Sequence, residues 1–199
     1  MIRNIIFDIG NVLADFCWRE MLRGRGMSEK MIERVGRASV ESPLWGEFDR
    51  GVWTPKEIMQ AFIQRDPEIS GELHLAFDDI HGMVKIKDYA IDWVKELKDK
   101  GYRVWYLSNF SRKAEVECAD SLAFLPYMDG GILSYREKMV KPNPAIYRLL
   151  LERYGLQPEE CVFIDDTALN VEAAKALGIK GIVFRDQAQA KEELRMLGV

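Results

Sequence analysis

The sequence is poor in cysteine and has no motif that pairs cysteines around a metal or in a disulfide framework. Its 199 residues include three cysteines, which lie far apart at Cys17, Cys118 and Cys161. An odd number of widely spaced cysteines without a CxxC motif argues against a structural zinc site and against a disulfide framework. The same pattern predicts a reducing, cytoplasmic location.

Long apolar runs and nucleotide-binding glycine motifs are also missing. No stretch approaches the roughly 18 apolar residues that a membrane span requires. The N-terminus shows no basic region followed by a long apolar run, so we expect no signal peptide. The absence of a GxxxxGK[ST] motif excludes the P-loop type of ATP site. A net charge of −4 argues against nucleic acid or an anionic membrane as the main partner.

Short apolar runs bounded by Gly, Asp or Ser are present, and they predict buried parallel strands. The expected strands cover residues 4–8, 103–107, 131–133, 161–165 and 181–184. Helical patterns separate them at 87–100, at 143–154 with Asn143 as cap and Gly155 as stop, and from Thr167, as a cap, to a stop at Gly178. This alternation predicts an α/β fold with a Rossmann-like, mostly parallel sheet.

The interval between the first two strands is too long for a simple crossover. More than ninety residues separate Asp8 from Arg103, whereas a βαβ crossover takes about 30. We expect helices there at 18–23, 28–40, 55–64 and 72–83, and an aromatic cluster of Trp45, Phe48 and Trp53 that packs in the core. The interval therefore predicts a helical cap domain, residues 15–85, inserted after the first strand of a core domain formed by residues 1–14 and 86–199.

Polar side chains follow the predicted strands where each strand ends. Asp8 ends the first strand, Ser108 and Asn109 follow the second, and Asp165 and Asp166 follow the fourth. Lys141 lies in the loop after the third strand. Because open α/β sheets bind ligands beyond the carboxyl ends of their strands, these side chains are expected to meet at one edge.

This set of side chains suits phosphoryl transfer. A carboxylate such as Asp8 can attack phosphorus and form an aspartyl phosphate. The transferred group carries negative charge, so the site needs donors and cations, which a lysine and a serine hydroxyl supply. Mg²⁺ prefers one or two carboxylates with waters and phosphate oxygens, and Asp8 and Asp166 can provide the carboxylates, with Asp165 close by.

In these motifs the sequence resembles the capped phosphatase branch of the haloacid dehalogenase superfamily. The resemblance implies Asp8 in FDIGNVLADF as the nucleophile, Ser108 and Asn109 in YLSN as phosphate contacts, and Lys141 in KPNPAIY as a catalytic and phosphate-binding residue. It implies Mg²⁺ bound by Asp8, by the backbone of Gly10 and by the pair in FIDDTALNVEAAKALG, with Asp166 as a metal ligand and Asp165 as a ligand or its support. The segment GEFDRGVWTPKEI, residues 46–58, is similar to cap segments of α-D-glucose-1-phosphate phosphatases and of epoxide hydrolase N-terminal phosphatase domains.

Gly10 is a departure from the pattern that the resemblance implies. The common motif is Asp-x-Asp, in which the second Asp gives a proton to the leaving group and then activates water. A positioned acid–base contributes about 10²- to 10⁴-fold to a rate. Asp15, Asn11 or a metal-bound water can stand in for the missing group, and the sequence does not choose among them.

The sequence therefore predicts a Mg²⁺-dependent phosphatase for a small phosphorylated metabolite, with a sugar phosphate favoured by the cap resemblance. A 2-haloacid dehalogenase is an alternative, because it also uses the nucleophile and lacks the second Asp. The pair Asp165-Asp166 disfavours it, since carbon–halogen chemistry needs no metal. A non-catalytic phospho-ligand-binding protein is a second alternative. A signalling receiver domain is the weakest alternative. Such domains carry their acidic pair at the first strand and the phosphorylated Asp later, which is the reverse of the order in this sequence.

Overall fold

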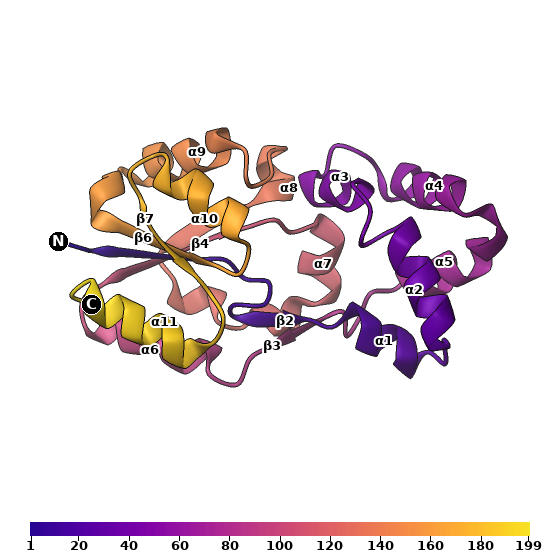
Figure 1. Ribbon diagram of the computed structural model, residues 1–199, viewed down its shortest axis with the longest axis horizontal. Helices are drawn as coiled ribbons and strands as arrows, with labels where there is room; N and C mark the ends of the chain where they lie inside the picture. The colour runs from indigo at the N-terminus through magenta and orange to yellow at the C-terminus, as the bar shows by residue number, and fades with distance from the viewer.

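A five-stranded parallel sheet forms the centre of the computed structural model, which describes residues 1–199 (Figure 1). The strand order is β5-β4-β1-β6-β7, and every neighbouring pair is parallel. The strands are β1 Asn4–Phe7, β4 Arg103–Ser108, β5 Gly130–Leu133, β6 Cys161–Asp165 and β7 Lys180–Val183. The predicted α/β fold is confirmed, and each strand limit lies within one residue of the expected one.

Alternate residues of each strand face opposite sides of this sheet, and helices cover both sides. Ile5 and Phe7 of β1 belong to one buried cluster together with residues of α6 and α11, whereas Ile6 belongs to a second cluster with residues of α9 and α10. Figure 1 shows these two helix pairs on opposite sides of the strands. Because both faces are covered, the strands are apolar throughout, as the sequence shows.

Six α-helices belong to the part of the chain that forms the sheet, and some of them begin or end at capping residues. They are α6 Ala90–Asp99, α7 Arg112–Glu117, α8 Ser134–Glu137, α9 Pro144–Tyr154, α10 Ala168–Lys175 and α11 Gln187–Met196. The Asn143 side chain accepts a hydrogen bond from the Ala145 amide, and Gly155 adopts a left-handed φ of 61°, as predicted for α9. The expectation for α10 was wrong in detail. Thr167 precedes that helix without a capping hydrogen bond, and the helix ends at Lys175, before Gly178.

Five α-helices lie between β1 and α6 in the chain and gather at one end of the molecule (Figure 1). They are α1 Trp18–Gly24, α2 Glu29–Ala38, α3 Leu44–Arg50, α4 Pro55–Arg65 and α5 Ser70–Phe77. Helix α3 was not predicted. The helix expected at 72–83 was wrong at its end, because Arg25 donates hydrogen bonds to the carbonyls of Leu75 and Ala76 and so closes α5 early.

Two short strands, which the sequence did not reveal, stand at the two ends of this helical segment. Strand β2, Ala14–Phe16, pairs in antiparallel fashion with β3, Val84–Ile86. At three residues each, they are too short to show an alternating pattern. Their pairing brings the entry and the exit of the helical segment side by side.

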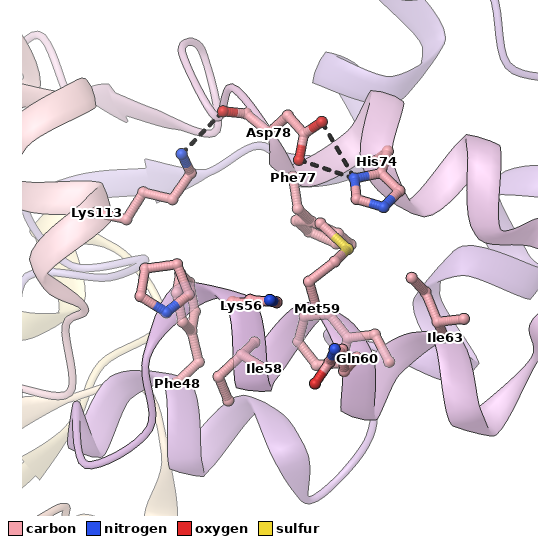
Figure 2. Close-up of a pocket in the computed structure, with 12 residues that line it drawn as sticks. Phe48, Lys56, Ile58, Met59, Gln60, Ile63, His74, Phe77, Asp78 and Lys113 are labelled. Carbon is pink, nitrogen blue, oxygen red and sulfur yellow. Dashed lines mark hydrogen bonds and ion pairs between the residues drawn. The ribbon is translucent and has the colours of Figure 1, made fainter.

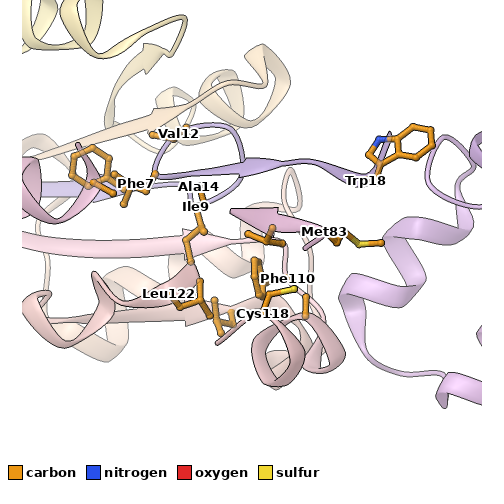
Figure 3. Packing of buried hydrophobic residues seen from close by; sticks show 14 of the residues in the cluster. Phe7, Ile9, Val12, Ala14, Trp18, Met83, Phe110, Cys118 and Leu122 are labelled. Carbon is orange, nitrogen blue, oxygen red and sulfur yellow. The ribbon is translucent and has the colours of Figure 1, made fainter. Parts of the chain in front are cut away.

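One continuous hydrophobic cluster joins the sheet to the helical segment. It includes Phe7 in the sheet, Ala14 at the start of β2, Met83 just before β3, and Trp18 at the start of α1 (Figure 3). The shared cluster means that the helices are packed on the core and not merely tethered to it. None of the helices combines the length and the apolar character that crossing a membrane requires.

Candidate active site

Asp8 lies directly beyond β1, where its backbone amide still bonds to the Ile164 carbonyl of the neighbouring strand at 2.9 Å. The residue is 7% exposed, and its side chain accepts a hydrogen bond from the Ile9 amide at 2.7 Å. Burial raises the pKa of Asp8 to about 6, although the Lys141 ammonium pulls that pKa downward. The group is thus a buried carboxylate whose charge depends on a nearby cation.

Lys141 is that cation, and it is almost completely buried. Its Nζ lies 2.8 Å from Asp8 Oδ1 and 2.7 Å from Asp165 Oδ2, and its side chain is 1% exposed. Burial lowers the pKa of Lys141, but the adjacent carboxylates of Asp8 and Asp165 outweigh burial and raise it overall. The lysine therefore stays charged between two carboxylates that would otherwise repel each other.

The Asn109 side chain holds the loop that carries Lys141. Its Nδ2 donates to the Lys141 carbonyl at 3.0 Å, and its Oδ1 accepts from the Lys141 amide at 2.8 Å. Ser108, the last residue of β4, is 1% exposed, and its hydroxyl lowers the pKa of Asp8 by hydrogen bonding. The two residues predicted as phosphate contacts thus both support the pair of Asp8 and Lys141.

The acidic pair after β6 divides into one buried and one accessible carboxylate. Asp165 is fully buried, and it accepts hydrogen bonds from the Thr167 amide at 2.8 Å and from Asn170 Nδ2 at 3.1 Å, in addition to its contact with Lys141. Asp166 is partly exposed and accepts a hydrogen bond from Asn11 Nδ2 at 2.9 Å. Asp166 therefore keeps carboxylate lone pairs available to a ligand, whereas Asp165 has used most of its own.

The loop after Asp8 has room for a side chain at position 10, and its conformation explains the asparagine at position 11. Nothing lies within 4 Å of the position that a Cβ of Gly10 would take. Asn11 adopts a left-handed φ of 56°, which asparagine tolerates better than most residues. Its amide is engaged on both sides, because Nδ2 donates to Asp166 and Oδ1 accepts from the Phe16 amide at 3.2 Å.

These residues surround one pocket between the sheet edge and the helical segment, with a volume of about 190 Å³. Four of the predicted site residues line it: Asp8, Gly10, Asn109 and Asp166. The other three, Ser108, Lys141 and Asp165, lie buried behind this surface. The pocket thus has a charged floor built from the ends of separate strands.

Asp49 is a pocket residue that the sequence did not reveal. It belongs to α3 and lines the same pocket as Asp8. Burial, followed by the negative charge of Asp8, raises the pKa of Asp49 to about 8. Helix α3 is a single two-turn helix in an irregular stretch, so no pattern in the sequence places one of its side chains opposite a distant strand end.

Two aromatic side chains form the apolar side of the pocket. Phe16 and Trp45 both line it, with ring centroids 5.6 Å apart. Trp45 and Phe48 are partly buried against the hydrophobic cluster, as expected. The expectation for Trp53 was wrong, because Trp53 is 39% exposed.

A second, larger cavity of about 480 Å³ lies among helices α3, α4 and α5 (Figure 2). Phe48, Phe62 and Phe77 line it, and all three rings pack against Trp45, with centroids 5.1, 6.4 and 6.0 Å away. Lys113, which comes from α7 of the core, lies at its margin in Figure 2 and donates to the Asp78 carbonyl at 2.9 Å. One aromatic cluster therefore separates this cavity from the pocket at Asp8.

The chemistry of the pocket floor suits a hard divalent cation. Carboxylate oxygens of Asp8, Asp165 and Asp166 lie within 4.8 Å of one another. Mg²⁺ takes oxygen ligands and uses one or two carboxylates with waters and phosphate oxygens. The donors of Asp8 and Asp166 fit that preference, whereas most of the Asp165 carboxylate is already bonded to Lys141 and Asn170.

The comparison with protein families identifies the class of this protein. The family model for haloacid dehalogenase-like hydrolases matches residues 2–178. The chain belongs to this family of hydrolases, and the resemblance seen in its sequence is confirmed.

Curated relatives in the family match nearly the whole chain. Sesquiterpene phosphatase astK of Aspergillus oryzae is 26% identical over 192 residues, which cover 96% of this chain and 94% of the relative. Bifunctional epoxide hydrolase 2 of Sus scrofa is 27% identical over 97% of this chain. The chain spans 38% of that relative and 36% of the drimenol cyclase drtB of Aspergillus calidoustus, to which it is 26% identical.

Solved structures share the fold. A haloacid dehalogenase family enzyme from Bacteroides thetaiotaomicron, in complex with magnesium and inorganic phosphate, superposes with a TM-score of 0.71 at 24% identity, covering 96% of this chain and 99% of that one. The L-2-haloacid dehalogenase from Xanthobacter autotrophicus superposes with a TM-score of 0.66 at 18% identity, covering 98% and 83%. Because a dehalogenase and an enzyme that binds magnesium and phosphate share this fold, the fold alone does not choose the reaction.

Proposed function

We propose that this hydrolase is a Mg²⁺-dependent phosphatase that transfers the phosphoryl group of a small metabolite to Asp8 and then to water. The observation that carries the proposal is the buried Lys141 ammonium, 2.8 Å from Asp8 and 2.7 Å from Asp165, beside the accessible carboxylate of Asp166. A nucleophilic carboxylate next to a fixed cation and a metal-ligating carboxylate is the arrangement that a phosphate dianion needs.

Each site residue has a distinct role in the proposed reaction. One Asp8 oxygen attacks phosphorus, the bond to the leaving oxygen breaks, and an aspartyl phosphate forms on Asp8. Lys141 neutralises the charge of Asp8, Ser108 stabilises that charge by hydrogen bonding, and Asn109 keeps the Lys141 loop in place. Water then attacks phosphorus, which releases inorganic phosphate and regenerates the carboxylate.

We assign the metal to Asp8, the backbone carbonyl of Gly10 and Asp166. When bound, Mg²⁺ neutralises the phosphate charge and so allows an anionic nucleophile to approach. Asp165 is assigned a supporting role, because Asn170, Thr167 and Lys141 already occupy its oxygens. This assignment chooses the supporting role for Asp165, for which the resemblance left both roles open.

We also propose the division into a core domain of residues 1–14 and 86–199 and a cap domain of residues 15–85. The pairing of β2 with β3 supports this division, because those strands stand at both boundaries. A cap that closes over the pocket excludes bulk water from the aspartyl phosphate.

The pocket favours a small substrate with one anionic end. Its volume of about 190 Å³ lies below the roughly 300–1,000 Å³ of sites for drug-sized ligands. A groove of about 540 Å³ adjoins it at Ser111 and carries Arg112, Lys113 and Lys138. Lys113 is paired with Glu117 in the same groove, so Arg112 and Lys138 are the cations that attract an anionic substrate in a protein of net negative charge. A sugar phosphate stays the preferred substrate, and its ring would lie against Phe16 and Trp45.

Hydrolysis of p-nitrophenyl phosphate by the purified protein, with Mg²⁺ and with EDTA, tests the proposal. We expect Mg²⁺-dependent release that Asp8→Asn abolishes and that Asp99→Asn, an exposed control on α6, leaves unchanged. A panel of hexose phosphates, a terpenyl phosphate and flavin mononucleotide then tests the substrate class. Chloride release from 2-chloropropionate that EDTA does not affect, without phosphatase activity, would replace the proposal by the dehalogenase alternative. Tight phosphate binding without any turnover would replace it by the non-catalytic one.

A further inference from the structure

The site described above has a nucleophile, but Gly10 has no side chain that could protonate the leaving group. Of the candidates from the sequence, the Asn11 amide is bonded on both sides, to Asp166 and to Phe16. Asp15 lines the pocket, but it is held in an ion pair with Lys87. Neither of these two groups is free to serve a leaving oxygen.

Asp49 is the remaining carboxyl group of the pocket, and it approaches from the opposite side. Asp8, Asp15 and Asp166 come from the core and its boundary strand, whereas Asp49 comes from α3 in the cap. Attack by Asp8 pushes the leaving oxygen away from the sheet edge, because the attacking and leaving oxygens are roughly in line. The leaving oxygen therefore emerges on the cap side of the pocket.

The position of Asp49 is fixed by contacts between the cap and the core. The buried hydroxyl of Ser134 donates to the Asp49 carbonyl at 2.5 Å, and Lys138 Nζ donates to the Gly51 carbonyl at 2.5 Å. The Asp49 carboxyl itself has no hydrogen-bond or ion-pair partner in the chain. The backbone of Asp49 is therefore held in place, while its carboxyl group stays available to a substrate in the pocket.

We propose that Asp49 is the acid–base residue of this enzyme and takes the place of the side chain absent at Gly10. This inference rests on the phosphatase activity proposed above. As the bond from phosphorus to the leaving oxygen breaks, the Asp49 carboxyl transfers its proton to that oxygen and becomes a carboxylate. The carboxylate then accepts a proton from the water that attacks the aspartyl phosphate, so alcohol and inorganic phosphate leave and Asp49 is protonated again.

The charges around Asp49 are consistent with this role. Burial is the main cause that raises the pKa of Asp49, Asp8 raises it further, and Lys141 opposes them. The other charged groups that line the pocket are Asp15 and Asp166, which are also acidic. A neutral carboxylic acid in the cap is thus expected near neutral pH.

The test compares two substrates of similar shape, p-nitrophenyl phosphate and phenyl phosphate, whose leaving phenols differ in acidity. The quantity kcat/KM covers the steps through transfer to Asp8, so it reports on protonation of the leaving group. For Asp49→Asn we expect kcat/KM to fall about 10²-fold with phenyl phosphate and by less than about tenfold with p-nitrophenyl phosphate, whose leaving group needs little acid. Glu47→Gln, on the same helix, is the matched control and is expected to leave both values unchanged.

The ratio of the two kcat/KM values in one preparation does not depend on the fraction of folded enzyme. Equal losses with both esters, or no loss with either, would overturn the assignment of Asp49 while leaving the phosphatase proposal intact. Absence of turnover of both esters by the wild-type protein would overturn the phosphatase proposal, and with it this inference.

Discussion

Among single residues, Lys141 is the one whose surroundings most clearly combine stability with chemistry. It lies buried between Asp8 and Asp165, with 1% of its side chain exposed. Removal of one member of a buried ion pair leaves an uncompensated charge, which is far more costly than the loss of an exposed pair. The residue that neutralises the proposed nucleophile is therefore also expected to hold the sheet edge together.

We predict that Lys141→Met lowers the free energy of unfolding by about 3–5 kcal/mol in the absence of metal, because Asp8 and Asp165 then face each other unpaired. Urea unfolding followed by tryptophan fluorescence measures this loss. Lys175→Met, which breaks an exposed pair with Glu172, is the control, with an expected change within about 0.5 kcal/mol. A loss below about 1 kcal/mol for Lys141→Met would mean that the two carboxylates do not depend on the lysine.

A second residue-scale prediction concerns the pH dependence of stability at Asp49. Its pKa rises from 3.8 to about 8 on folding, so the folded state keeps a proton that the unfolded chain releases. The contribution of this group to stability is complete below about pH 4 and is lost as the pH rises through about 8. The free energy of unfolding of Asp49→Asn minus that of the wild type should therefore increase from pH 5 to pH 9, by on the order of 2–4 kcal/mol. Chemical denaturation at both pH values checks this, and a pH-independent difference would contradict it.

At the scale of elements, the short helix α3 connects the cap to the proposed chemistry. It carries Asp49, it forms part of the aromatic wall through Trp45, and it packs on α8 of the core. Gly51 closes the helix with a left-handed φ of 67°, and a Cβ there would lie 2.8 Å from Tyr135 Cβ. The close approach of α3 and α8 therefore requires glycine at position 51.

Two glycine substitutions on α3 should have opposite effects. Gly51→Ala should lower the free energy of unfolding by about 1–3 kcal/mol through left-handed strain and overpacking, and it should also lower kcat/KM, because α3 must shift and Asp49 moves with it. Gly46→Ala meets nothing within 4 Å inside the same helix, and it should raise stability by about 0.5–1 kcal/mol. Thermal unfolding and hydrolysis assays on both variants measure these effects. Equal behaviour of the two variants would show that the contact with Tyr135 does not matter.

For the whole molecule, the proposed metal site predicts a coupling between Mg²⁺ and global stability. A ligand that binds only the folded state at about 100 times its Kd stabilises that state by about 2.7 kcal/mol. For a chain of this size, that corresponds to a rise in Tm of about 5–10 °C. Differential scanning calorimetry with and without Mg²⁺ measures the shift, which Asp166→Asn should largely remove and Asp99→Asn should retain. An unchanged shift in Asp166→Asn would place the metal elsewhere.

The sequence by itself determined the sheet, its parallel order of apolar strands and the residues at their ends. Strands covered on both faces must be continuously apolar, and the parallel arrangement brings their ends to one edge. Asp8, Lys141 and Asp165 could therefore be grouped from the order of the strands and loops alone. The long interval after β1 likewise predicted helices, because their 3.6-residue periodicity is a local property.

Only the tertiary structure decided how the groups share their hydrogen bonds and what faces them across the pocket. The buried position of Asp165 against Lys141, the clamp of Asn109 on the Lys141 loop and the accessible face of Asp166 depend on packing between distant segments. Strands β2 and β3 were missed because each is too short to show a period, and helix α3 was missed because it was not distinguished from the irregular stretch around it. Asp49 meets the sheet edge only because that helix docks on α8, a contact between segments about 85 residues apart in the chain, for which local sequence holds no signal.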